Sequence, residues 1–218
     1  MIYSNERKLV LSGWLNENDI NSYNTPLKLQ KFLLLYESFA KISGEKPDFS
    51  HLRGYKKGPV FSNVWGDYTK EKNAFNEAAK NAYKLGKNDI NVQRAKKCSF
   101  IVRTMNETEL SELTHQMNLW KSKKARIMSG EYNVDLSEKD FDENDEYLMK
   151  LLDSMYSADV IDDCNIFNLD KNYFVFSKND SNKLTEKHFD ILMTLAEQED
   201  LHNPVYVYID SEGRLVID

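Results

Sequence analysis

The chain has 218 residues, of which 41% are hydrophobic and 29% charged, and its formal net charge is -6 at pH 7. This composition is typical of a globular protein, and the negative charge argues against a surface that binds nucleic acid non-specifically. No apolar run approaches the ~20 residues that span a bilayer, the N-terminus lacks a signal-peptide pattern, and the two cysteines lie far apart. These features predict a folded cytoplasmic protein without membrane contact.

A first helix is expected from about residue 5 to residue 15, with Leu9, Val10 and Trp14 on its buried side. The polar stretch 16–24 is rich in turn-forming residues, so we expect a loop there.

The next helix is the most informative part of the chain. Thr25 can cap its N-terminus, Pro26 fits the first helical position, and Gly44 offers a stop. Apolar residues cover more than one side of this helix, which predicts that it is buried at the centre of the protein. They include Leu29, Phe32, Leu33, Tyr36 and Ala40. Polar Gln30 should then satisfy a backbone group of a neighbouring loop.

The run Gly58, Pro59 and Val60 predicts the start of another helix, because proline is favoured in a first turn. The free N–H groups of that turn would lie beside a tyrosine and two lysines of the preceding loop. Such a surface suits an acidic partner or the backbone carbonyls of a partner protein. The candidate partner-binding residues are Tyr55, Lys56, Lys57, Gly58, Pro59 and Val60.

Further helices are expected over 73–85 and 120–128. Between them, Asn106 and Glu109 can form the capping box of another helix. The segment 99–103 fits either a short strand or a helix entry.

Residues 135–146 carry seven carboxylates against one lysine, which is typical of a solvated loop or helix entry. They lead into a helix with six apolar residues on one side: Tyr147, Leu148, Leu151, Leu152, Met155 and Tyr156.

The pattern changes towards the C-terminus. Residues 173–176 have strand composition, and Thr185 can cap a helix. The segments 205–209 and 214–217 predict a β-hairpin.

The expected fold class is therefore α+β, a mostly α-helical body with a small C-terminal module of antiparallel β-sheet and helix. We expect a helical domain over 1–145 and a helix plus α+β module over 146–218, which can pack together as one domain.

The sequence offers little for metal or cofactor chemistry. Asp140, Asp142 and Asn144 match the opening of an EF-hand loop, but Asp145 and Leu151 occupy the positions that need Gly and Glu. There is no Gly-rich phosphate loop, and the four histidines lack partners at zinc-ligand spacing. We predict no catalytic residue, no metal and no cofactor.

Two other kinds of activity stay open. His115, beside Thr114 and Glu112, could be the general base of an unrecognised enzyme, although an imidazole that hydrogen-bonds a neighbouring loop is commoner. The basic stretches 94–97 and 121–126 could contact phosphates, although such runs are most often solvated faces. Nucleic-acid binding is therefore not the expected role.

Two motifs together resemble the Panacea (SocA-like) domain of bacterial and phage antitoxins. The first is the tract Leu27, Lys28, Leu29, Gln30 and Lys31, followed by the Gly-Pro-Val run at 58–60. The second is Thr114 and His115, followed by Trp120. The resemblance spans roughly residues 5 to 145.

The resemblance implies a protein-binding fold and not an enzyme. The expected function is that of an antitoxin-like protein, which neutralises a co-encoded toxin by direct contact or by delivering it to a protease. The expected partners are thus a toxin encoded nearby and, for delivery, a protease. The family-motif residues are expected to be structural. The alternatives are a phage or mobile-element regulatory protein with weak nucleic-acid contact, and the enzyme centred on His115.

Overall fold

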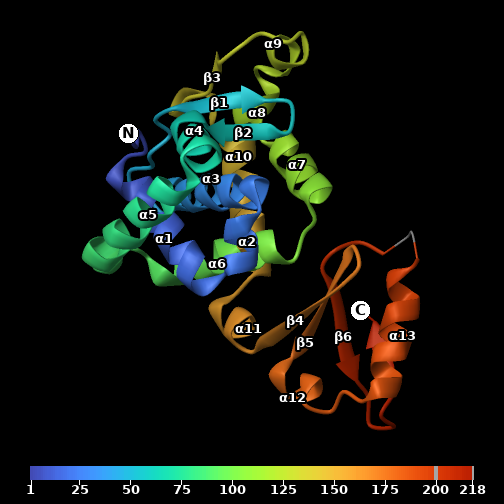
Figure 1. Ribbon diagram of the computed structural model, residues 1–218. Coiled ribbons are helices and arrows are strands. Elements are labelled where there is room, and N and C mark those ends of the chain that lie inside the picture. Colours follow the sequence, from blue (N-terminus) through green and yellow to red (C-terminus); the bar gives the residue numbers. More distant parts are fainter. Residues whose placement is uncertain (199–200, 218) are drawn as a thin grey trace.

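The computed structural model describes residues 1–198 and 201–217 (Figure 1). Helices account for 60% of the chain and strands for 14%, and the strands form two small sheets, so the predicted α+β class is confirmed. A helical body precedes a C-terminal module, and α11 lies between the two groups of elements (Figure 1).

The body contains helices that precede a short β-hairpin in the sequence and helices that follow it. Its first elements are α1 (Glu6–Asn18), α2 (Ile20–Asn24), α3 (Pro26–Ile42), β1 (Leu52–Tyr55), β2 (Gly58–Phe61), α4 (Ser62–Lys70) and α5 (Lys72–Gly86). The following elements are η1 (Lys87–Asp89), α6 (Val92–Arg103), α7 (Glu107–Gln116), α8 (Asn118–Lys121), α9 (Lys124–Met128), β3 (Val134–Asp135), η2 (Glu138–Asp140) and α10 (Glu143–Met155).

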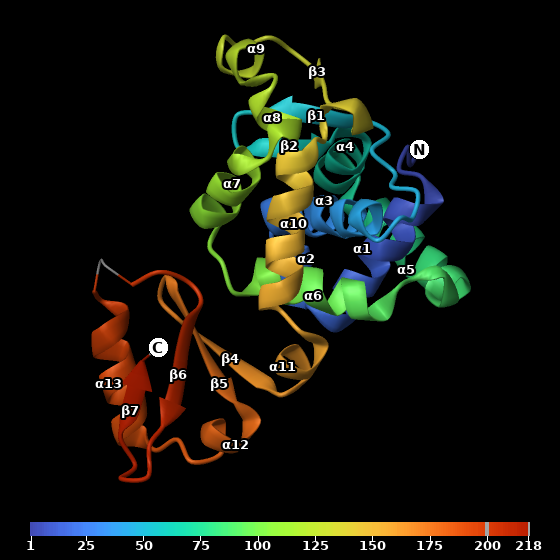
Figure 2. The same ribbon diagram turned by 180° about the vertical axis from the view of Figure 1, so that it is seen from behind.

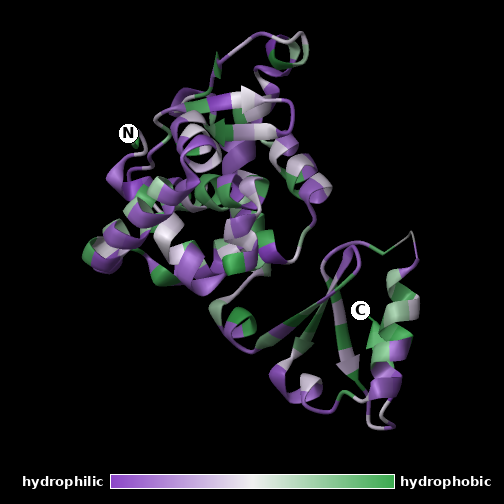
Figure 3. Ribbon diagram, viewed as in Figure 1, coloured by the Kyte–Doolittle hydropathy of each residue, from purple (hydrophilic) through white to green (hydrophobic). Residues whose placement is uncertain are grey.

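Helix α3 is the centre of the larger hydrophobic core, as predicted. Leu29, Phe32 and Leu33 are fully buried, and the helix packs against α1, α6, α10 and β2. Figure 3 shows its hydrophobic residues in the middle of the body. Pro26 occupies the first turn, and Gly44 follows the helix with φ +75°, a conformation that glycine adopts without strain.

The predicted loop over 16–24 is wrong. Helix α1 continues to Asn18, and α2 begins directly after Asp19. The Asp19 carboxylate accepts hydrogen bonds from the N–H of Ser22 and from the hydroxyl of Ser99 on α6. These polar residues are therefore caps and core contacts and not a solvated turn.

The predicted helix start at Gly58 is also wrong, because Gly58–Phe61 is strand β2. It pairs antiparallel with β1, and Pro59, which has no N–H to donate, lies opposite Gly54. The N–H of Phe61 donates to Oε1 of Gln30 at 2.8 Å, so a side chain of α3 satisfies this strand. The free first-turn donors expected at Gly58 therefore do not arise there, and the helix begins at Ser62.

Several other predictions concern the second half of the body. The helix over 73–85 is confirmed as α5, and the capping box of Asn106 and Glu109 begins α7. The open segment 99–103 is the end of α6. The single helix expected over 120–128 is wrong, because the chain turns between α8 and α9.

The acidic stretch is mostly exposed or half-buried and contains the start of α10, as predicted, but one of its carboxylates, Asp145, is buried. Asp145 accepts hydrogen bonds from the N–H groups of Asn118 at 2.5 Å and Leu119 at 2.9 Å. It thereby satisfies two free donors at the start of α8, directly after the break at Met117 that separates α8 from α7.

Helix α10 crosses the body and packs against α3 (Figure 2). Its buried side carries Met149 and Leu152, whereas Tyr147, Leu151 and Met155 are exposed. The apolar side predicted for this helix is therefore only partly correct. Asp145, Met149 and Leu152 follow one another at spacings of four and three residues, so the buried carboxylate lies on the same side of α10 as its buried apolar residues.

A buried ion pair joins α1 to α3. The Nζ atom of Lys8 lies 2.5 Å from Oε1 of Glu37 and 3.3 Å from Oδ2 of Asp48, and both partners of the closer pair are almost fully buried. Arg7 also donates to Glu37, at 2.8 Å. Charges buried in this way need a partner of opposite sign, and here the protein supplies it internally.

The C-terminal module contains a four-stranded sheet. Its elements are α11 (Ala158–Asp162), β4 (Cys164–Leu169), β5 (Asn172–Ser177), α12 (Lys178–Ser181), α13 (Glu186–Ala196), β6 (Val205–Ile209) and β7 (Leu215–Ile217). The strand order is β4-β5-β6-β7. The predicted helix and β6–β7 hairpin are confirmed, and Thr185 caps α13.

The prediction of an antiparallel sheet is wrong for one pair, because β5 and β6 are parallel. The chain leaves β5, passes through α12 and α13, and returns to begin β6 at the same end of the sheet. Phe174, Phe176, Leu192, Val205 and Val207 form the small core between this sheet and α13.

The module also contacts the body. Val175 and Tyr206 pack into the larger core. The Glu109 carboxylate closes the capping box of α7 and accepts hydrogen bonds from both the backbone and the side-chain amide of Asn203. The expected division between 1–145 and 146–218 stays a prediction, although the buried residues of α10 belong to the larger core.

Candidate functional site

The two halves of the first motif, 27–31 and 58–60, meet at one cavity of about 470 Å³. It lies between the start of α3, the β1–β2 hairpin, α4 and the start of α7, and we call it the hairpin groove. Its lining residues are Pro26, Leu27, Gln30, Lys31, Tyr55, Lys56, Lys57, Val60, Trp65 and Glu107.

Hydrophobic side chains form most of the groove surface. Leu27 and Tyr55 are half-buried, Val60 is buried, and Trp65 is 37% exposed. Large aromatic side chains that keep one face open are common anchors in protein interfaces. The groove can therefore receive an apolar side chain of another molecule.

A buried amine lies beneath the hairpin turn. Lys31 is 1% exposed, and its Nζ donates to the carbonyl of Lys57 at 2.8 Å. Burial lowers the pKa of the Lys31 amine to about 7. Gly58 makes this approach possible, because it has φ +102° and a Cβ there would lie 2.3 Å from Nζ of Lys31.

The predicted partner-binding residues divide into two groups. Tyr55, Lys56, Lys57 and Val60 line the groove, whereas Gly58 and Pro59 are buried within the hairpin behind it. The predicted family-motif residues also divide: Leu27, Gln30 and Lys31 line the groove, Leu29 lies in the core, and Lys28 faces a second cavity.

The second motif supports the hairpin from the other side. The Nε1 atom of Trp120 donates to the carbonyl of Tyr55 at 2.9 Å, and the ring of His115 stacks on Trp120 with centroids 3.9 Å apart. A Cβ at Gly58 would lie 2.6 Å from the hydroxyl oxygen of Thr114. All three residues of this motif thus lie close to the hairpin that forms one wall of the groove.

Among the described residues, no hydrogen bond joins His115 to the hydroxyl or thiol of a nucleophile. Thr114, the nearest candidate in the sequence, donates its hydroxyl to backbone carbonyls of its own helix. Burial and the nearby charge of Lys31 lower the pKa of the His115 imidazole. Its Nε2 atom is buried without a hydrogen-bond partner among the described residues.

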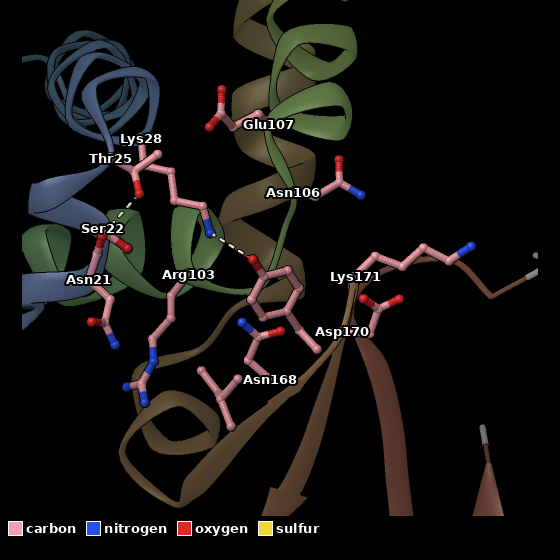
Figure 4. Close-up of a pocket in the computed structure, with 12 residues that line it drawn as sticks. Asn21, Ser22, Thr25, Lys28, Arg103, Asn106, Glu107, Asn168, Asp170 and Lys171 are labelled. Carbon is pink, nitrogen blue, oxygen red and sulfur yellow. Dashed lines mark hydrogen bonds between the residues drawn. The ribbon is translucent and has the colours of Figure 1, made fainter. Parts of the chain in front are cut away.

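A polar cavity of about 700 Å³ lies where the C-terminal module meets the body. Figure 4 shows Lys28 extending from α3 into this cavity, and its Nζ donates a hydrogen bond to the hydroxyl of Tyr173 at 3.2 Å. Burial, opposed by Asp19, lowers the pKa of Lys28 to about 8. Arg103, Glu107, Asp170 and Lys171 bring both signs of charge to the same cavity (Figure 4). The mixed lining favours no single class of ligand.

The basic stretches are largely paired within the protein. Arg94 forms a salt bridge with Glu45, and Lys96 and Lys97 pair with Asp162 and Asp153. In the second stretch, Lys123 pairs with Asp140 and Arg126 pairs with Glu131. These contacts reduce the charge that either stretch offers to a nucleic acid.

Within the part of the chain that the structure describes, no group of three or more His, Cys, Asp or Glu side chains is placed to hold a metal ion. In the stretch that resembles an EF-hand opening, Asp140 pairs with Lys123 and Asp142 caps α10.

Burial raises the pKa of the Cys98 thiol, which disfavours the reactive thiolate. No helix over residues 1–198 and 201–217 has the length and apolar character needed to cross a membrane.

Sequence reasoning missed Trp65 and Glu107 as groove residues. Val60, Phe61, Val64, Trp65 and Tyr68 read in the sequence as the apolar residues of one amphipathic helix, yet adjacent residues of a helix point in directions about 100° apart. Val64 and Tyr68 are buried, and Trp65 is left on the groove side. That angular separation is the signal that could have identified it.

Comparisons of the chain with protein-family models, with curated proteins and with solved structures each returned no match.

Proposed function

We propose that this chain is an antitoxin-like protein that binds a co-encoded toxin through the hairpin groove and neutralises it. The supporting observation is that both halves of the first Panacea-like motif contribute side chains to one apolar groove. Direct occlusion of the toxin and delivery of the toxin to a protease both begin with this binding step. The paired basic stretches give less support to a nucleic-acid role.

The test is a growth assay in which the protein is co-expressed with the product of the neighbouring gene. The double variant Tyr55→Ala/Lys57→Glu removes an aromatic anchor of the groove and reverses an exposed charge. Loss of an interface anchor commonly costs about 2 kcal/mol, or roughly thirtyfold in affinity, so protection should fall. Its melting temperature should stay near that of the wild type.

The matched control is Tyr147→Ala/Lys150→Glu, which makes the same kinds of change on exposed residues of α10. It should protect cells fully. If the control loses protection while the groove variant keeps it, the binding surface is on α10. A neighbouring gene product that is harmless when expressed alone contradicts the antitoxin function.

A further inference from the structure

Two of the buried lysines, Lys8 and Lys31, differ in whether a carboxylate lies beside the amine. Lys8 lies between the carboxylates of Glu37 and Asp48. Lys31 is equally buried, but among the described residues it forms no salt bridge and its one hydrogen-bond acceptor is the carbonyl of Lys57. A buried ammonium without an anion is costly, so an anion supplied from outside would be stabilised at Lys31.

The surroundings of Lys31 reinforce this local positive charge. Lys56 and Lys57 are exposed on the turn directly above it, and neither forms a salt bridge with a described residue. The groove thus contains three lysines and a single carboxylate, Glu107, in a protein whose formal net charge is -6. This one site has the sign opposite to that of the molecule as a whole.

Apart from Gln30, whose oxygen already accepts from Phe61, the remaining lining of the groove is mainly apolar, and this lining decides between the anions that a basic site can attract. Leu27, Val60 and Trp65 form a hydrophobic wall next to the lysines. A nucleic-acid backbone would leave this wall unused, whereas a peptide can place an apolar side chain on it and a carboxylate beside the amines.

We propose that the hairpin groove binds a protein segment in which an apolar side chain adjoins one or more carboxylates. The apolar side chain packs against Leu27 and Trp65, and the carboxylate lies at the turn formed by Lys56 and Lys57, within the field of Lys31. This inference rests on the proposed function and names the chemistry of the toxin segment that the groove recognises.

The experiment uses the full chain labelled with ¹⁵N and two peptides of equal length, Ac-Leu-Phe-Asp-Glu-NH₂ and Ac-Leu-Phe-Asn-Gln-NH₂. Amide spectra are recorded during titration at low salt. The acidic peptide should shift the amide resonances of Tyr55, Lys56, Lys57 and Val60 and the indole N–H resonance of Trp65. It should bind about tenfold more tightly than the neutral peptide, as expected for charge pairs at an interface.

Two variants locate the source of this preference. Lys56→Gln/Lys57→Gln changes only exposed residues and should reduce the ratio of the two peptide affinities severalfold. Lys31→Met replaces the buried amine with an apolar chain of similar length and should also reduce the preference. If Lys31→Met does not fold, the double variant still decides the test.

Several results would overturn the inference. They are equal affinity for the two peptides, no binding of either peptide, or shifts that map away from the groove. A thymidine oligonucleotide that binds the groove more tightly than the acidic peptide would show that the anion is a phosphate.

Failure of this inference is distinguishable from failure of the antitoxin proposal. Protection in the growth assay together with equal peptide affinities removes only the charge preference. Selective peptide binding beside a harmless neighbouring gene product removes only the antitoxin function.

Discussion

The side-chain oxygen of Gln30 accepts a hydrogen bond from the backbone N–H of Phe61 at 2.8 Å, and both residues are buried. Through this bond a side chain of the central helix α3 satisfies the backbone of the hairpin strand β2, at the place where both halves of the first motif line the groove. The bond confirms the expectation that Gln30 serves a backbone group.

Replacing Gln30 with methionine should lower the free energy of unfolding by about 1–3 kcal/mol, because the buried N–H of Phe61 would lose its acceptor. Methionine keeps the length and the packing volume of glutamine. Chemical denaturation provides the measurement. Gln93→Met, at an exposed position of α6, is the control and should change stability by less than about 0.5 kcal/mol. Equal effects of the two substitutions would contradict a special role for the Gln30 bond.

Gly58→Ala should destabilise the protein by about 1–3 kcal/mol or more. Its φ of +102° disfavours any side chain, and the added Cβ would meet Lys31 and Thr114. Gly66→Ala should instead raise the free energy of unfolding by about 0.5–1 kcal/mol. Gly66 lies inside α4, and no atom lies within 4 Å of an added Cβ. Thermal melts of both variants check the pair, and a neutral Gly58→Ala would be inconsistent with the close packing of the hairpin turn.

Leu33→Asp should prevent folding of the body, because an unpaired buried charge costs several kcal/mol and domains hold only about 5–15 kcal/mol. Leu33 is fully buried in α3. Leu85→Asp makes the same substitution at a residue that is 85% exposed, and it should melt like the wild type. Circular dichroism during heating distinguishes the two, and a normal melting curve for Leu33→Asp would place the core elsewhere.

The buried amine of Lys31 predicts a specific dependence of stability on pH. Its pKa in the folded protein is about 7, whereas an unfolded lysine has a pKa of about 10.4. Between these values the unfolded chain binds more protons than the folded one. Stability contributed by this site therefore rises with pH, by up to about 1.4 kcal/mol per unit. Below pH 7 both states are protonated, and the full cost of the buried charge is present.

The measurement is the difference in unfolding free energy between the wild type and Lys31→Met from pH 6 to pH 10. Subtracting the variant removes the contributions of neighbouring titrating groups that do not depend on Lys31. Lys80→Met, at an exposed position of α5, is the control. Its unfolding free energy should change with pH in the same way as that of the wild type. A Lys31→Met curve that also runs parallel would show that the amine is not buried in solution.

Local signals predicted most of the helices and the caps that begin them. Asn106 with Glu109, Thr185 and the apolar face of α3 all act within a few residues of the elements that they define. Such contacts are written into short windows of sequence, so periodicity and capping rules find them.

The hairpin at the groove could not be predicted in the same way. Its strands have four residues each, its turn contains two lysines, and Gly58 with Pro59 also fits a helix entry. What selects the strand is the acceptor that Gln30 supplies from α3. The burial of Asp145 likewise depends on the N–H groups of α8, far away in the sequence. Interactions of this kind appear only when distant segments are assembled.

Glu109 serves two parts of the molecule with one carboxylate, since it accepts from Asn106 within α7 and from Asn203 in the C-terminal module. The same rotamer satisfies both, so the start of α7 is most ordered when the module is docked. Unfolding or removal of the module frees Glu109 to sample other rotamers and loosens the first turn of α7, whose Glu107 lines the hairpin groove. The C-terminal module is therefore thermodynamically linked to the shape of a groove that it does not line.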